Sequence, residues 1–290
     1  MTEDVRCVVD ARNSLGEGPL WDVAEQALYW VDIEGKLLQR YWPETGAVEV
    51  WPMPDRITGV AVRERGGLIA SFASGIAMVD PSKGSVDWLV RPDTDKGNRF
   101  NDCKCDRKGR FWAGSMDDAM KRHSGALFRI DPDGSAHRML DNWGISNCPV
   151  WSLDDKTFYF ADSMNSQIYK LAFDLEKGTL GEPRVYADTR ADKCAPDGGT
   201  IDAEGFIWNA QWDGWRVVRY APDGQVDRIV KLPVQKPTSC MFGGPNLATM
   251  YITSASIGLS EADKKAQPQA GGLFALDVGV RGVPETRFAG

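Results

Sequence analysis

The chain alternates short hydrophobic segments with polar turns along almost its entire length. The apolar segments are a few residues long and rich in aromatic and β-branched residues, which is typical of β-strands. Tight turns of Gly, Pro and Asp recur between them, as in Asp131 to Gly134 and Ala221 to Gly224. Helical periodicity is almost absent, and only Glu261 to Gln267 is expected to form a turn or two of helix. The pattern therefore predicts an all-β protein.

The hydrophobic segments also repeat at a regular interval. Six of them start 40 to 49 residues apart, which is the length of one four-stranded propeller blade. A β-sandwich also contains many short strands, but it does not require such a repeat to be kept six times. We therefore predict a six-bladed β-propeller. The six segments begin at Leu28, Leu68, Arg110, Thr157, Phe206 and Met250.

Length and composition fit one folded unit. All-β proteins of closed architecture reach 290 residues as single domains, and 42% hydrophobic with 26% charged residues is ordinary for a globular protein. No linker, low-complexity segment or change in composition divides the chain, so residues 1–290 are expected to form a single domain. The net charge of −7 and the absence of a Lys/Arg cluster argue against a nucleic-acid partner.

The termini and cysteines indicate a cytoplasmic location. The N-terminal residues carry acids and no apolar segment, unlike a secretory signal, and no stretch approaches the 18 apolar residues of a membrane span. The six cysteines are scattered and lack the paired spacing of a metal site, so reduced thiols are expected. We expect no membrane partner and a monomer or small homo-oligomer.

A polar residue precedes each of the six segments by nine to eleven positions. In a propeller the innermost strand of each blade lines the central channel, so equivalent positions of the repeat converge on one axis. We therefore predict a ring of polar side chains at one end of the channel. Its members are Glu17, Thr58, Asn101, Asn147, Asp197 and Ser239.

Three members of this ring form a candidate metal site. The carboxylates of Glu17 and Asp197 would raise each other's pKa unless a cation lay between them. Carboxylate oxygens and the Asn147 amide are hard ligands, which suit Ca²⁺, Mg²⁺ or Mn²⁺, while Zn²⁺ or Fe²⁺ stays open. The alternative is that each residue only caps the end of its strand. The matched positions of Glu17, Asn147 and Asp197 in the repeat favour one divalent metal ion.

The residues around the ring suggest a polar small-molecule ligand. Glu17 lies between Gly16 and Gly18, which let the backbone approach a ligand closely, and Asp197 lies in the equally constrained Pro196-Asp197-Gly198-Gly199. Arg99, two residues before Asn101, offers a guanidinium group suited to sugar hydroxyls or a carboxylate, although it could equally be a surface residue. Trp212 and Trp215 are candidates for stacking on a sugar.

Several short motifs together resemble the SMP-30/gluconolactonase/regucalcin family. They are Gly16-Glu17-Gly18-Pro19, Arg99-Phe100-Asn101-Asp102, Ser146-Asn147, Pro196-Asp197-Gly198 and Phe242-Gly243-Gly244, and the likeness runs from about Ser14 to the C-terminus. The resemblance implies a six-bladed propeller of metal-dependent lactonases, some of which act on aldonolactones in bacterial sugar oxidation. One branch of the family is known as a calcium-associated protein.

The resemblance also assigns roles to individual residues. Glu17, Asn147 and Asp197 match the family's metal ligands, Asp197 matches the proposed general base, and Arg99 and Asn101 match the substrate-contacting pair. One position departs from the pattern, because the family often has Gly after the metal-binding Asn and this chain has Cys148. The loop from Asp117 to His123, where relatives carry a lid, cannot be matched residue by residue.

These assignments lead to an enzymatic hypothesis, the hydrolysis of a pentonic or hexonic sugar lactone to its aldonic acid in bacterial oxidative sugar catabolism. The metal polarises the lactone carbonyl, Asp197 takes a proton from the attacking water, and Arg99 and Asn101 hold the ring hydroxyls. A Ser-His-Asp mechanism is not favoured, because the chain has only two histidines and no GxSxG motif. The alternatives are a calcium-binding propeller without turnover and a propeller esterase or organophosphate hydrolase.

Overall fold

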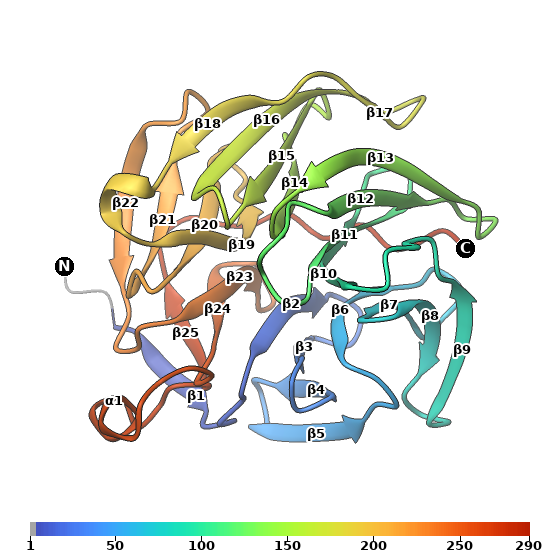
Figure 1. Cartoon of the computed structure of the whole chain (residues 1–290). Helices are drawn as coiled ribbons and strands as arrows, with labels where there is room; N and C mark the ends of the chain where they lie inside the picture. Colours follow the sequence, from blue (N-terminus) through green and yellow to red (C-terminus); the bar gives the residue numbers. More distant parts are fainter. Residues whose placement is uncertain (1–3) are drawn as a thin grey trace.

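The structure, a computed structural model, describes residues 4–290 and is a six-bladed β-propeller, which confirms the predicted fold class. Six antiparallel sheets are arranged around a central axis, with the first strand of each blade innermost (Figure 1). The six innermost strands are β2 (Gly16–Asp22), β6 (Ile57–Val62), β10 (Asn98–Cys105), β14 (Ser146–Trp151), β19 (Ala195–Ile201) and β23 (Pro237–Gly243).

The outer strands complete each blade in chain order. In blades 1 to 3 they are β3 (Ala27–Asp32), β4 (Leu37–Trp42), β5 (Ala47–Pro52), β7 (Leu68–Phe72), β8 (Gly75–Asp80), β9 (Ser85–Val90), β11 (Phe111–Asp117), β12 (Gly125–Ile130) and β13 (Ala136–Trp143). In blades 4 and 5 they are β15 (Thr157–Asp162), β16 (Gln167–Asp174), β17 (Thr179–Leu180), β18 (Arg184–Asp188), β20 (Ile207–Trp212), β21 (Arg216–Tyr220) and β22 (Val226–Lys231).

Blade 6 closes the ring by combining both ends of the chain. Its second and third strands are β24 (Thr249–Ser254) and β25 (Leu273–Asp277), and β1 (Arg6–Val9) pairs with β25 as the outermost strand. The helix expected between Glu261 and Gln267 is present as α1 (Glu261–Ala266), and a short 3₁₀ turn, η1, spans Arg190–Asp192. Within residues 4–290, no helix has the length and apolar character needed to cross a bilayer.

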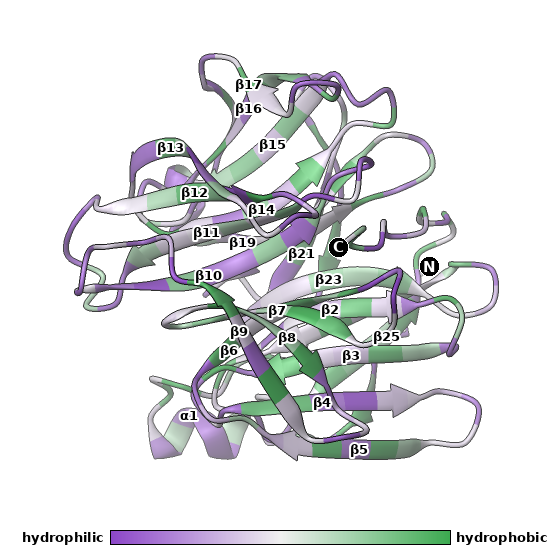
Figure 2. Cartoon of the chain, turned by 90° about the vertical axis from the view of Figure 1, so that its right-hand side faces the viewer, coloured by the Kyte–Doolittle hydropathy of each residue, from purple (hydrophilic) through white to green (hydrophobic). Residues whose placement is uncertain are grey.

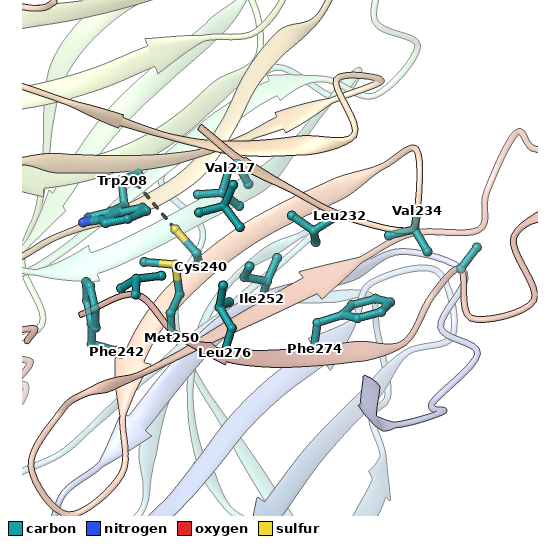
Figure 3. Packing of buried hydrophobic residues seen from close by; sticks show 14 of the residues in the cluster. Trp208, Val217, Leu232, Val234, Cys240, Phe242, Met250, Ile252, Phe274 and Leu276 are labelled. Atoms are coloured by element: carbon teal, nitrogen blue, oxygen red, sulfur yellow. Dashed lines mark hydrogen bonds between the residues drawn. The ribbon is translucent and has the colours of Figure 1, made fainter. Parts of the chain in front are cut away.

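The core is divided into six hydrophobic clusters, one at each interface between neighbouring blades. Figure 3 shows the cluster between blades 5 and 6, where Trp208 of β20 faces Cys240 of β23, and Ile252 and Phe274 extend the packing outward. Hydrophilic residues gather in the loops that join the strands (Figure 2). Every blade buries apolar surface against its two neighbours, so all six interfaces between blades stabilise the fold. Each Å² of apolar surface buried contributes about 25 cal/mol.

Buried aspartates brace the turns before the second strands of two blades. Asp202 accepts hydrogen bonds from the indole N–H of Trp208 (2.9 Å) and from Arg219 (2.8 Å), and its backbone amide pairs with the carbonyl of Phe206 (3.0 Å). Asp106 does the same in blade 3 for Trp112 (2.8 Å) and Arg110 (2.6 Å). In both blades the Trp follows the Asp by six positions, and this spacing corresponds to the same hydrogen bond between the turn and the core.

Candidate active site

The predicted ring residues occupy equivalent places on the six innermost strands. In all six blades the pairing of the innermost strand with its neighbour shifts register at or beside the ring residue, and such β-bulges re-aim side chains. Glu17, Asn101, Asn147 and Asp197 line one pocket of about 230 Å³ at the start of these strands. The innermost strands β2 and β19 both lie around the central axis (Figure 1), and their ring residues Glu17 and Asp197, 180 positions apart in sequence, line this one pocket.

The other two ring residues do not line this pocket. The Thr58 hydroxyl lies 2.7 Å from the Ser71 hydroxyl and is turned into blade 2. Ser239 lines a narrow cavity of about 20 Å³, which also borders Asp102 and Lys104. The six ring residues thus have equivalent backbone positions, but only four of their side chains line the pocket.

Two carboxyl groups lie together on the pocket floor. Glu17 and Asp197 are 7% and 6% exposed and line the same pocket, and they are close enough for the charge of Glu17 to act on Asp197. Burial, followed by the negative charge of Asp102, raises the pKa of Glu17 to about 8. Burial and the charge of Glu17 raise the pKa of Asp197 well above its ordinary value. Both groups therefore hold a proton more tightly than usual as long as no cation compensates their charge.

Asn147 is held beside these carboxyl groups in a fixed orientation. Its Oδ1 accepts a hydrogen bond from Asn101 Nδ2 (2.7 Å), and its Nδ2 donates to Ser163 Oγ (2.8 Å). Ser163 in turn donates to the carbonyl of Pro196 (2.6 Å), the residue before Asp197. A carboxamide oxygen has two lone pairs, so Asn147 Oδ1 keeps one acceptor site for a further ligand. Nothing in the sequence patterns pointed to Ser163.

The residue after Asn147 has a backbone conformation that favours glycine. Cys148 is fully buried and has φ = 54°, the same left-handed conformation as Gly18 (φ = 54°) after Glu17. Its amide donates to Asp102 Oδ2 (2.8 Å), while Asp102 Oδ1 accepts from the amide of Cys103 (2.8 Å). Asp102 therefore holds the backbone that presents Asn147, a role not assigned from the sequence.

Replacing Cys148 should reveal this backbone strain. An L-residue in the left-handed region costs roughly 1–2 kcal/mol relative to glycine. Cys148→Gly and Cys148→Ala both remove the buried thiol, but only the glycine variant relieves the strain. We expect Cys148→Gly to be more stable than Cys148→Ala by about 1 kcal/mol in urea unfolding, the reverse of the order in ordinary strands. An alanine variant as stable as the glycine variant would contradict this explanation.

Arg99 is part of the pocket and not a surface residue, since it is only 8% exposed. Its Nη1 donates to the carbonyl of Phe100 (2.9 Å) and to Asn101 Oδ1 (2.7 Å), and its Nε lies 3.2 Å from Asp118 Oδ1. Arg56 holds the same Asp118 carboxylate with two hydrogen bonds of 2.7 and 3.0 Å. Two arginines from blades 2 and 3 thus fix one carboxylate of the 117–123 loop beside the pocket.

The 117–123 loop is braced along its length. Asp117 accepts from the amide of Lys121 (2.8 Å) and from the Arg122 guanidinium (2.7 Å), and Arg122 also pairs with Asp95 (2.9 Å). The loop places Met120 against the pocket, whereas His123 is exposed and does not line it. Of the two tryptophans singled out above, Trp212 lines the pocket and Trp215 does not.

The donor atoms of the floor suit a divalent cation. Glu17 and Asp197 offer carboxylate oxygens, and Asn147 offers a carboxamide oxygen. The charge of Arg99 lowers the pKa of Glu17, but burial and the charge of Asp102 outweigh it. In residues 4–290 no three His, Cys, Asp or Glu side chains are clustered as a metal site, and a ligand set built on this floor would include the Asn147 amide. Such an all-oxygen set fits hard cations.

Fold and pocket together define a propeller protein with an acidic small-molecule site on its axis. Comparisons with known proteins specify the family. The model of the SMP-30/gluconolactonase/LRE-like region matches residues 15–256. Regucalcin of Xenopus laevis is 40% identical over 99% of this chain and 98% of its own length, and a 6-deoxy-6-sulfogluconolactonase of Pseudomonas putida is 37% identical over the whole of both chains.

A solved structure agrees with this. The calcium-binding protein regucalcin of Agrobacterium tumefaciens superposes with a TM-score of 0.95 at 27% identity, covering 99% of this chain and 97% of that one. The chain belongs to the SMP-30/gluconolactonase family, as its motifs had suggested.

Proposed function

We propose that this protein is a divalent-metal-dependent lactonase, a carboxylic ester hydrolase that opens a sugar lactone to the aldonic acid. The observation that carries the proposal is the pair of buried, adjacent carboxyl groups of Glu17 and Asp197 beside Asn147, on the floor of an axial pocket. The family includes a named sulfogluconolactonase, which supports a sugar lactone as the substrate, and regucalcins described as calcium-binding, which support a divalent ion. A place in bacterial oxidative sugar catabolism is part of this proposal.

Each residue of the floor has a defined task in this reaction. A divalent cation bound by Glu17, Asn147 and Asp197 would supply Lewis acidity toward the lactone carbonyl oxygen. Asp197 accepts a proton from the water that attacks the carbonyl carbon, and it returns the proton to the ring oxygen when the carbon–oxygen bond of the ester breaks. Arg99 and Asn101, which are locked to each other, orient the lactone ring above the floor.

The proposal is tested by adding a panel of aldonolactones to the purified protein and recording acid release with a pH indicator. We expect turnover that depends on added Ca²⁺, Zn²⁺, Mg²⁺, Mn²⁺ or Fe²⁺ and stops when EDTA is added. Tight binding of a divalent ion without hydrolysis of any lactone would instead select a calcium-binding propeller without turnover. Hydrolysis of aryl esters or organophosphates but not of lactones would select the esterase alternative.

A further inference from the structure

A second tier of side chains lies above the floor of the pocket. In each blade it is the residue two positions before the ring residue, which lies either in the innermost strand (Arg99, Ala195 and Pro237) or directly before it (Leu15, Arg56 and Ile145). The tier is apolar in blades 1, 4, 5 and 6 and basic only in blades 2 and 3. Its members, in blade order, are Leu15, Arg56, Arg99, Ile145, Ala195 and Pro237.

The upper wall of the pocket is therefore mostly carbon. Leu15, Ile145 and Ala195 of the second tier line it, and the 117–123 loop adds Met120. Met116 and Trp212 complete this apolar set, which we call the rim. Met120 is 60% exposed, so the rim is open to an entering ligand.

The polar groups of the upper wall are already engaged with the protein. Ser163 Oγ both accepts from Asn147 (2.8 Å) and donates to a backbone carbonyl (2.6 Å). Arg99 uses its Nη1 and Nε on Phe100, Asn101 and Asp118, which leaves Nη2 as its group without an assigned partner. The rim thus offers very few donors or acceptors to the hydroxyl groups of a ligand.

The charges around the rim are also balanced. Asp118 neutralises part of the charge of Arg56 and Arg99, and Glu34 lies 3.2 Å from Arg56. Lys236 sits 4.4 Å from the ring centroid of Trp212 and 3.7 Å from the Asp213 carboxylate. An anionic group on a ligand could reach Arg99 Nη2, but the charge of that guanidinium is already offset by Asp118.

We infer that the substrate is an uncharged sugar lactone that lacks a hydroxyl at the end remote from the ester, such as a 6-deoxyhexonolactone. This rests on the proposed function. In a hexono-1,4-lactone the C5–C6 side chain extends away from the carbonyl carbon, so C6 lies toward the rim when the ester is on the floor. A methyl group is removed from water there with a gain, whereas a hydroxyl is desolvated without a partner.

The inference is tested with lactone pairs that differ only at this position. L-Fuconolactone is compared with L-galactonolactone, and L-rhamnonolactone with L-mannonolactone, so that ring configuration is constant within each pair. We expect kcat/KM to be about tenfold higher for the deoxy member, the discrimination typical of an apolar pocket. A third comparison, of gluconolactone with its 6-phosphorylated form, should favour the uncharged lactone.

A rim variant links the preference to the pocket. Met120→Gln keeps the length of an exposed side chain and brings a carboxamide to the rim, so the preference for the deoxy lactone should fall to about threefold or less. Leu153→Gln, a similar change at a 39% exposed leucine that does not line the pocket, should keep the full preference.

The outcomes separate the two proposals. Hydrolysis that favours the hydroxylated or the 6-phosphorylated lactone would overturn the inference and leave the lactonase function intact. If Met120→Gln leaves the preference for the deoxy lactone unchanged, the apolar rim does not cause that preference. Absence of hydrolysis for every lactone would contradict the proposed function and with it the inference.

Discussion

Replacing Asp197 by Asn is expected to lower kcat for lactone hydrolysis by about 10² to 10⁴, the range contributed by a general base. The amide keeps one oxygen for the cation and the shape of the side chain, but it cannot accept a proton from water. Rates are therefore compared at a concentration of divalent ion that saturates each protein, with saturation established by calorimetric titration. Under these conditions a weaker affinity for the ion no longer contributes to the loss.

A matched substitution in the same blade controls for nonspecific effects. Asp223 is an exposed aspartate in the turn between β21 and β22, and Asp223→Asn should leave kcat within a factor of two. A loss of less than tenfold in Asp197→Asn at saturating ion would exclude Asp197 as the base. The lactonase function would then require another proton acceptor on the floor, and Glu17 is the carboxyl group that remains.

The fold was predictable because its signal is spread over the whole chain. Each repeat of 40 to 49 residues buries its apolar face against the next, so the period and the turns suffice without any single strong motif. Once the six blades close into a ring, the equivalent positions of their innermost strands must lie around the same central axis. This is why Glu17, Asn101, Asn147 and Asp197 could be expected in one pocket before their distances were known.

The remaining features of the site depend on side-chain choices that the repeat does not encode. Thr58 has the same backbone position as Asn101, yet its short side chain forms a hydrogen bond with the Ser71 hydroxyl and does not line the pocket. Ser163 directly follows β15, the second strand of blade 4, and lies outside the repeat position of the ring. The bracing of the 117–123 loop by Arg56 joins two blades through long side chains, and no local pattern predicts such pairing.

The apolar residues of the second tier, in contrast, have a fixed spacing from the ring residues in the sequence, but they were not predicted to line the pocket. One polar position per repeat marks the ring, and a second position two residues earlier carries Leu15, Ile145 and Ala195 at the same pocket. Because the repeat brings equivalent positions to the axis, these residues could also have been expected beside the ring residues. The apolar lining of the pocket is therefore encoded in the repeat as well.

Removal of the divalent ion is expected to destabilise the protein in a way that depends on pH. In the metal-free fold the pKa of Glu17 is raised to about 8 and that of Asp197 is also raised. The folded state then binds protons more tightly than the unfolded chain does, so the metal-free protein loses stability as pH rises from about 4.5 to 8. A cation replaces these protons, and its stabilising effect should therefore be larger at pH 8 than at pH 5.

The measurement is thermal unfolding with EDTA or with added ion at both pH values. At 100 times its Kd the ion adds about 2.7 kcal/mol to the free energy of unfolding, which corresponds to a rise in Tm of roughly 5–10 °C at pH 8. Asp197→Asn relieves the repulsion with Glu17, so it should be more stable than the wild type in EDTA at pH 8, and its weaker affinity should give a smaller rise in Tm than the wild type at the same concentration of ion. Glu64→Gln, at an exposed site far from the floor, should respond as the wild type does. An equal rise in Tm at pH 5 and pH 8 would mean that the ion binds elsewhere, because only a site built on these two buried carboxyl groups exchanges protons for the cation over this interval.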